Sequence, residues 1–290
     1  MISIVIISKD EAELDETLTD VEAEVSSLTE SAEIVVVDAS SGRLDYIRQR
    51  HEPTTHWIDF KQPAGIRISI PHQRNAGVRE ARGDIIVFID AGCRPNEKWL
   101  MHLLAPLLEE SEMAVTGIFV DAGGKGRYEL DAEELKNVYV RECPTLNLAF
   151  RREAFDAVGG FDESFEYGSD VDFSWRLNDI GYRIRRVPDA VVRHDWGTPR
   201  RQRRRSYLYG KARARLYLKH KARRKNVLRD DPIVVIYPLF LLGLPLTVVF
   251  PLYPLLLLIP AWRNRSHGVI QVLSDHLWFG AGALAELARR

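Results

Sequence analysis

The sequence predicts an α/β fold with a doubly wound, mostly parallel sheet, followed by basic and hydrophobic helices that associate with a membrane. Short apolar runs alternate with helical patterns up to about residue 120, as in folds whose parallel strands are joined by helices. The run IIVFI at 85–89 has no polar alternation, which is typical of a central strand covered on both faces. From residue 232 the chain carries no charge until Arg263.

The expected elements alternate regularly in the first half and less regularly in the second. Expected strands cover residues 2–7, 33–37, 54–60, 85–89, 113–120, 145–151, 183–187 and 190–193. One expected helix follows the first strand, another ends at the Arg-Gly-Asp of 82–84, and the later ones cover 99–110, 152–158 and 170–179.

Two of the expected strands end in a carboxylate. Asp38 follows the second strand, and Asp90 follows the strand at 85–89. An aspartate after a strand is often a simple turn residue, and Gly92 and Pro95 do break regular structure there. However, α/β sheets bind ligands at the carboxyl ends of their strands, so two such ends predict a ligand site.

The net charge of −1 over 290 residues conceals a strongly basic segment. Residues 193–229 contain about fifteen Lys or Arg and a single acidic residue, Asp195. Such segments usually contact phosphate in nucleic acids, lipid head groups or nucleotides. The two cysteines, Cys93 and Cys143, lack the spacing of a metal site or a disulfide framework, which indicates a reducing compartment.

The uncharged segment 232–262 predicts a membrane-associating element. As one helix it would extend about 45 Å, enough for a single tilted transmembrane helix across a hydrocarbon core of about 30 Å. Five prolines recur through it and favour kinks, so a re-entrant or monotopic hairpin folded near 243–251 is the alternative. A pair of buried core helices is a third, less favoured interpretation.

The basic segment sets the expected side of the membrane. Lys and Arg next to an apolar segment stay on the cytoplasmic side, so we expect the protein on the cytoplasmic side of the cell membrane, against an anionic membrane surface. Nucleic-acid binding is the competing interpretation, but the apolar segment that follows favours lipid, and no nucleic acid partner is expected. The expected division of the chain is 1–198, 199–231 (basic, juxtamembrane), 232–262 (hydrophobic) and 263–290 (amphipathic tail).

Five motifs occur in a characteristic order: SIVIISKDE, VVVDASS, RNAGVREARGDIIVFIDAGCRP, NLAFRREAFDAVGGFDESF and YGSDVDFSWRLNDIGYRIRRVPDAVVRH. Together they resemble the family 2 glycosyltransferases of the GT-A fold, inverting enzymes that use nucleotide-sugar donors, over about residues 1–225. The resemblance implies transfer of a sugar from a nucleoside-diphosphate sugar to a hydroxyl of a lipid-linked or cell-envelope glycan acceptor.

The resemblance also implies the residues that bind the donor. Ser8 and Glu11 on the first loop, with Asp38, would hold the nucleoside, since carboxylates accept hydrogen bonds from base N–H groups and ribose hydroxyls. Arg74 would approach the base or the pyrophosphate as a charged donor. Asp90 would complete the donor site.

Metal binding is a further implication of the resemblance, and here the chain departs from the family. The family usually has an Asp-x-Asp triplet whose last carboxylate binds Mg²⁺ or Mn²⁺, and here that position is Gly92. Asp90 can remain a metal ligand with the help of His194, although a histidine at the end of a closing strand is often structural. Alternatively, Arg and Lys of 200–211 neutralise the leaving diphosphate without a divalent cation.

Asp170 is the expected catalytic base. Inversion requires a carboxylate that removes the proton of the acceptor hydroxyl, and the family uses the second residue of a Glu-Asp pair, here Ser169-Asp170. Asp172 and Arg176 would support it. The structural alternative is a capping box formed by Ser169 and Asp172 at the start of a helix.

Three further expectations concern the second half of the chain. Gln202 and Arg205 resemble the Gln-x-x-Arg-Trp element of processive synthases, with Ser206 in the Trp position, although a basic helix explains them equally well. Tryptophans 99, 175 and 196 either line a sugar site or, more in keeping with their type, pack in the core. Gly92 and Ser169 suggest a rival function, a catalytically impaired nucleotide-sugar-binding or scaffold protein at the membrane.

Overall fold

The computed structural model describes residues 1–109, 112–121, 138–195, 198–259 and 269–289. The chain forms two compact units, Met1–Asp195 and Trp196–Arg290. Trp196 itself lies outside the described residues, as do 260–268 of the hydrophobic segment and the tail. The finer division of the second half into basic, hydrophobic and amphipathic parts stays a prediction.

Within the described residues, the first unit contains one nine-stranded sheet in the order β3-β2-β1-β4-β8-β6-β9-β5, with β7 paired to β9. The strands are β1 (Ile2–Ser8), β2 (Ala32–Asp38), β3 (Thr55–Asp59), β4 (Ile85–Ile89), β5 (Arg94–Pro95), β6 (Ala114–Asp121), β7 (Tyr139–Val140), β8 (Asn147–Arg151) and β9 (Ile184–His194). Strands β3, β2, β1 and β4 are parallel, and β8 is antiparallel between β4 and β6. The predicted α/β class with a mostly parallel central sheet is confirmed.

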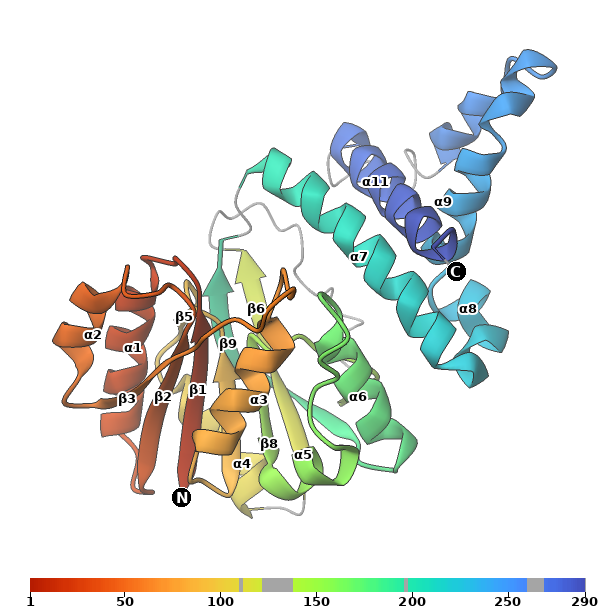
Figure 1. Cartoon of the computed structure of the whole chain (residues 1–290). Helices are drawn as coiled ribbons and strands as arrows, with labels where there is room; N and C mark the ends of the chain where they lie inside the picture. The colour runs from red at the N-terminus through yellow and green to blue at the C-terminus, as the bar shows by residue number, and fades with distance from the viewer. Residues whose placement is uncertain (110–111, 122–137, 196–197, 260–268, 290) are drawn as a thin grey trace. The chain divides into compact units, whose positions relative to one another are not determined.

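Helices cover both faces of this sheet, as expected for a doubly wound fold (Figure 1). One face carries α3 (Ile70–Glu80), α5 (Arg152–Val158) and α6 (Ser169–Asp179), and the other carries α1 (Leu14–Ser26) and α4 (Trp99–Glu109), with α2 (Asp45–His51) packed beside α1. Helix α3 approaches β1 and β2 closely because residue 77 is glycine. A methyl group there would overlap the side chain of Val5 and lie 3.2 Å from Val37 Cγ2.

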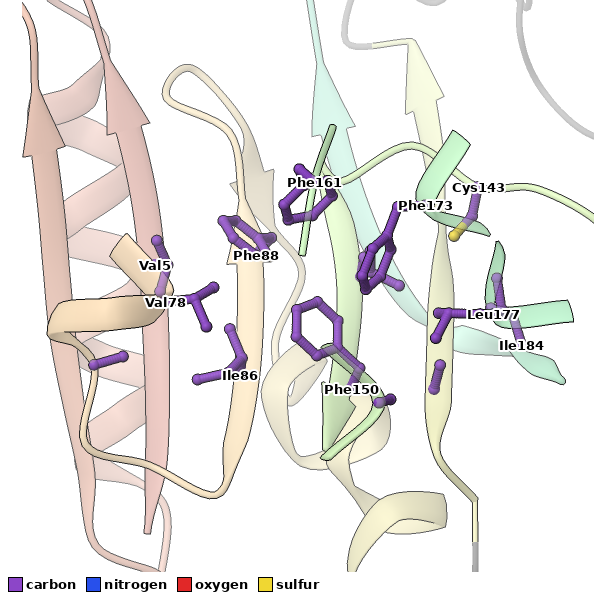
Figure 2. Close-up of a cluster of buried hydrophobic side chains, with 14 of the residues drawn as sticks. Val5, Val78, Ile86, Phe88, Cys143, Phe150, Phe161, Phe173, Leu177 and Ile184 are labelled. Carbon is purple, nitrogen blue, oxygen red and sulfur yellow. The ribbon is translucent and has the colours of Figure 1, made fainter. Parts of the chain in front are cut away.

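The core under α3, α5 and α6 is rich in phenylalanine (Figure 2). The rings of Phe161 and Phe173 have centroids 4.5 Å apart, and Phe161 meets Phe88 of β4 edge to face at 5.6 Å. Phe150 of β8 lies 5.2 Å from Phe173. Aromatic pairs in these geometries add to the stabilisation that burial alone provides. The loop before α6 is therefore anchored to the sheet through Phe161.

A buried asparagine fixes the irregular half of the sheet. The amide nitrogen of Asn147 donates to the carbonyl oxygens of Ile118 (2.8 Å) and Ala190 (2.9 Å), and its oxygen accepts from the Trp99 indole (2.8 Å). Trp99 is fully buried, so the core interpretation of this tryptophan is confirmed. Strand β6 skips one residue of its ladder with β9 at Gly117, beside this amide.

One correction concerns the end of the first unit. The two closing strands expected at 183–187 and 190–193 are a single strand, β9, of 11 residues. Pro188 does not interrupt it, because it is exposed and falls between the partners Thr116–Arg186 and Ile118–Val191, where the ladder with β6 is irregular. A proline at such a bulge removes no ladder hydrogen bond.

The second unit is helical. It contains α7 (Pro199–Lys219), the 3-10 helix η2 (Lys221–Asn226), α8 (Val227–Asp230), α9 (Ile233–Leu242), the 3-10 helices η3 (Leu244–Val248) and η4 (Tyr253–Leu257), and α11 (Val269–Leu287). Helices α7 and α11 meet backbone to backbone. A methyl group on Gly210 would collide with the Phe279 carbonyl, and one on Gly282 with that of Tyr207.

The expectation of one continuous apolar helix, as a single membrane span requires, is wrong for the described part of 232–262. The segment forms α9 of 10 residues and two 3-10 helices of 5 residues each. Pro245 and Pro254 lie in the first turn of η3 and η4, and proline has no N–H with which to continue a preceding helix.

Within the described ranges, every helix is too short or too polar to cross a membrane.

We expect the change Gly77→Ala to destabilise the first unit by about 1–3 kcal/mol, because the added methyl group forces α3 away from Val5. Urea denaturation measures the loss. The matched control is Glu80→Ala, which alters an exposed position of the same helix and should change the free energy of unfolding by less than about 0.5 kcal/mol. Equal stability of the two variants would contradict the packing argument.

Candidate functional site

The carboxyl ends of neighbouring parallel strands carry a row of polar side chains. Ser8, Asp38 and Asp59 are register partners across β1, β2 and β3, so they lie side by side at one edge of the sheet. Asp90 directly follows β4, the other neighbour of β1. Glu11 is partly exposed on the loop from β1 to α1, which leaves the same edge. The structure thus brings together the predicted nucleoside-binding residues and Asp90.

Asp38 is buried and held by the loop that follows it. Its Oδ1 accepts hydrogen bonds from the backbone N–H (3.1 Å) and the hydroxyl (2.5 Å) of Ser40. The Ser40 Oγ accepts from the Asp10 N–H at 2.7 Å, and Arg43 pairs with Asp10 at 2.6 Å. Burial raises the pKa of Asp38, and the hydrogen bonds from Ser40 oppose the shift. These contacts tie the loops after β1 and β2 together and orient Asp38.

Two buried polar atoms at this edge lack a hydrogen-bond partner in the described part of the chain. They are Ser8 Oγ and Arg74 Nε, on side chains that are 3% and 6% exposed as whole residues. Buried polar atoms in folded proteins are nearly always paired. The Ser8 hydroxyl and the Arg74 Nε–H are therefore available to a polar ligand.

Arg74 connects α3 with the start of α6. Its Nη1 donates to the Ser169 Oγ at 3.0 Å, and its guanidinium lies 5.5 Å from the centre of the Phe161 ring. The next residue, Asn75, clamps the loop before α6: its amide donates to the Phe161 carbonyl and accepts from the Phe161 N–H, both at 2.9 Å. The Arg-Asn pair thus positions this loop, a role of Asn75 that was not predicted.

Asp170 lies in the first turn of α6, and its Oδ1 accepts a hydrogen bond from the Val171 N–H at 2.9 Å. Burial raises the pKa of its carboxyl group. The positive charge of Arg74 lowers this pKa, and the negative charge of Asp90 raises it. Arg74 donates to Ser169, the residue before Asp170, and Arg74 and Asp90 both lie close enough to Asp170 to shift its pKa, although the three residues come from different segments.

The capping-box interpretation of α6 is wrong. Gly168 occupies the N-cap position in a left-handed conformation and has no side chain with which to form a capping box. Ser169 instead accepts from Arg74, and the carboxylate of Asp172 is fully buried in an ion pair with Arg176 at 2.8 Å. Arg176 also donates to the carbonyl oxygens of Val158 and Gly160. Asp172 and Arg176 therefore hold α6 against the α5 loop, which places Asp170.

The turn after Asp90 is shaped by its glycine. The Cys93 N–H donates to the Asp90 carbonyl at 3.1 Å, and Gly92 has a φ of +85°, a left-handed conformation that favours glycine. Thr17 of α1 fastens this turn, because its hydroxyl accepts from the Gly92 N–H and donates to the Cys93 carbonyl, both at 2.9 Å. His194 reaches the same turn, with its Nδ1 3.6 Å from Cys93 Sγ.

The described residues contain no group of three or more His, Cys, Asp or Glu side chains that could hold a metal ion by themselves. Asp90 nevertheless offers a carboxylate at the ligand edge, and His194 lies beside the turn that follows it. Mg²⁺ and Mn²⁺ are often held by one or two carboxylates together with phosphate oxygens of a substrate. The residues present fit a cation bound jointly with a diphosphate.

The remaining expectations concern Trp175 and the basic residues of α7. Trp175 is buried and donates to Glu142 at 2.9 Å, so it packs in the core as Trp99 does. Gln202 and Arg205 lie on α7 in the second unit, where Gln202 is buried. Their approach to the leaving diphosphate stays a prediction, and so does that of the other basic residues of 200–211.

Two family models match the chain. A model described as Glycosyl transferase family 2 matches residues 3–169, and one described as Glycosyl transferase family group 2 matches residues 135–279. Pre-mycofactocin glycosyltransferase of Mycobacterium tuberculosis is 32% identical over 162 residues, 51% of this chain and 34% of that protein. Glycosyltransferase AglE of Haloferax volcanii is 26% identical over 139 residues, 42% of each chain. The chain thus spans less than half the length of these curated relatives.

Solved structures support the GT-A fold. Mannosyltransferase PcManGT from Pyrobaculum calidifontis, in complex with GDP-Man and Mn²⁺, has a TM-score of 0.70 at 19% identity, over 100% of this chain and 87% of that one. GalNAc-T7 with UDP, GalNAc and Mn²⁺ has a TM-score of 0.52 at 18% identity, over 74% and 50%. At these identities the likeness concerns the fold alone.

The raised pKa of Asp170 predicts a pH-dependent cost in stability. The folded protein holds the proton of the Asp170 carboxyl group more tightly than the unfolded chain does. The contribution of Asp170 to stability is therefore fully present below the pKa of the unfolded chain and is lost as pH rises through the pKa of the folded protein. The change Asp170→Asn removes that loss. We expect the free energy of unfolding of the variant, minus that of the native protein, to increase with pH above about 3.8. Denaturation at several pH values measures it, and a difference that decreases would contradict the assignment.

Proposed function

The chain belongs to glycosyl transferase family 2, and we propose that it transfers a sugar from a nucleoside-diphosphate sugar to a hydroxyl of a lipid-linked or cell-envelope glycan. The observation that supports the proposal is the proximity of three residues: Arg74 donates to Ser169, the residue before Asp170, and both Arg74 and Asp90 shift the pKa of Asp170. Arg74 provides a positive charge for the diphosphate, and Asp170 provides a carboxylate whose pKa is raised.

The donor lies along the edge formed by β2, β1 and β4. Asp38 and Glu11 accept hydrogen bonds from the nucleoside, and the unpaired hydroxyl of Ser8 contributes a further one. The unpaired Nε of Arg74 donates to the pyrophosphate, where a charge-assisted hydrogen bond is stronger than a neutral one. This pairing would also compensate the buried charge of Arg74.

Asp170 acts as the general base. A base works best when its pKa approaches the working pH, and burial moves the pKa of Asp170 in that direction. It removes the proton of the acceptor hydroxyl while the oxygen attacks the anomeric carbon from the face opposite the leaving diphosphate. Asp172 and Arg176 position it through the buried ion pair.

Asp90 would hold a divalent cation together with the diphosphate, with His194, which lies beside the turn after Asp90, as a second candidate ligand. Such a cation would supply charge stabilisation to the leaving diphosphate. The glycine at position 92 does not remove this role, because one protein carboxylate suffices for a cation that the substrate also binds.

The rival function, a catalytically impaired binding or scaffold protein, is not favoured. Gly92 and Ser169 are the residues that suggest it, yet the structure gives a reason for each of them. Gly92 takes a left-handed conformation, and Ser169 accepts the hydrogen bond of Arg74. We place the protein on the cytoplasmic side of the cell membrane, where an acceptor linked to lipid would be presented.

We expect Asp170→Asn to lower kcat by about 10²–10⁴-fold while the dissociation constant of the donor changes little, because the amide cannot accept the hydroxyl proton. Donor turnover and calorimetric donor binding, screened over a panel of nucleotide sugars, measure the two quantities. The control is Asp179→Asn, an exposed aspartate at the end of the same helix. Unchanged turnover in Asp170→Asn would refute the base assignment.

We expect Mn²⁺ to bind tightly only together with a nucleoside diphosphate, because the described residues provide no complete metal site. Calorimetry with Mn²⁺ alone, and then with nucleoside diphosphate present, distinguishes the two cases. The change Asp90→Asn should weaken the joint binding by about tenfold or more. Tight binding of Mn²⁺ to the free protein would show that the cation does not depend on the diphosphate.

A further inference from the structure

Helix α9 is apolar on every side, including the side whose residues are exposed in the described part of the chain. Tyr237 packs against Gly280 of α11, and Val234 and Phe240 are also buried. On the other side, Ile236, Leu239 and Leu242 are 53%, 60% and 63% exposed. A helix at a water-exposed surface normally presents polar residues outward, whereas a helix that is apolar all round lies in a core or a membrane.

The chain after α9 continues this apolar surface through a turn. Tyr253 of η4 stacks on Phe240 of α9 with ring centroids 5.2 Å apart, so the chain folds back on the helix. At the turn, Val248 and Val249 are 87% and 86% exposed. We call residues 233–259 the apolar hairpin. Its other exposed large side chains are Leu244, Leu246, Phe250, Leu252, Leu255, Leu256, Leu258 and Ile259.

The side-chain polar groups of the apolar hairpin are satisfied from within the protein. The Thr247 hydroxyl donates to the Leu244 carbonyl at 2.7 Å, and the Tyr253 hydroxyl donates to the Phe240 carbonyl at 3.0 Å. The Tyr237 hydroxyl lies 2.8 Å from His276 Nδ1. In hydrocarbon every polar group must be satisfied internally, and the hairpin meets this demand for its side chains.

The length and the charges of this region fit one leaflet. The 10 residues of α9 extend about 15 Å, half of a hydrocarbon core of about 30 Å. The basic turn η2, with Lys221, Arg223, Arg224 and Lys225, comes shortly before the base of α9. A head-group layer at that base would meet cations, while the uncharged tip at Val248 reaches the acyl chains.

We propose that the apolar hairpin 233–259 inserts into one leaflet of a bilayer, with the tip at Val248 and Val249 among the acyl chains and the lysines of η2 at anionic head groups. The occupant of the exposed face is therefore lipid, and the hairpin enters and leaves on the same side. The inference concerns the second unit alone and does not depend on the reaction proposed above.

Co-sedimentation of the full chain with phosphatidylcholine vesicles, with and without phosphatidylglycerol, tests the proposal. The combined changes Val248→Asp and Val249→Asp should lower the partition coefficient by at least about a hundredfold, because two apolar side chains are replaced by charges that resist entry into hydrocarbon. Both side chains are almost fully exposed, so folding should not suffer. The matched control Met101→Asp, at an exposed apolar residue of α4, should bind as the native protein does.

Two further measurements separate the contribution of the lysines from that of apolar insertion. Lys221→Gln with Lys225→Gln should weaken binding to the anionic vesicles by about fivefold per lysine and leave neutral vesicles unaffected. The fluorescence of a Val248→Trp variant should be quenched by lipids brominated on their acyl chains. No vesicle binding by the native protein, or equal binding by the double Asp variant, would overturn the proposal. So would self-association without vesicles that the double Asp variant abolishes, since a second copy would then cover the hairpin.

Discussion

A buried guanidinium group governs the arrangement of the first unit. Arg74 is 6% exposed, and arginine keeps its charge in proteins, so its neighbours must compensate that charge. Ser169 accepts one of its hydrogen bonds, the Phe161 ring lies beside it, and Asp170 supplies an opposite charge. Helix α3, the aromatic loop and the start of α6 are thus coupled through one side chain. The partner that its Nε lacks is what a bound anion would provide.

Much of the fold follows from patterns that depend on burial alone. The runs of β1, β2 and β4 are apolar because both faces of these strands are covered, and so their positions could be predicted from sequence. The single strand β9 and the broken segment 232–262 could not. Pro188 reads as a strand end unless the irregular ladder with β6 is known, and the prolines after α9 permit several turns whose geometry depends on tertiary contacts such as Phe240–Tyr253.

The candidate site shows a similar division. Asp38, Asp90 and Asp170 could be proposed because the chemistry of a carboxylate and its position in a motif both pointed to these residues. Thr17 and Asn75 were missed because they act on segments 75 and 86 residues away. A threonine in an amphipathic helix carries no local sign of such a contact, whereas Asn75 stands beside Arg74 in a motif and offered a weak one.

The glycines at the crossing of α7 and α11 have a consequence for how the second unit can vary. Gly210 and Gly282 leave no room for even a methyl group, so the two long helices form a fixed clamp whose sequence can change little at these positions. The turns η3 and η4, between α9 and residue 260, pack on α9 and on each other. Because lengthening a loop costs little free energy, the length of these turns can change without disturbing the crossing of α7 and α11. We therefore expect the crossing of α7 and α11 to stay constant in this second unit, while the turns after α9 can differ in length and sequence.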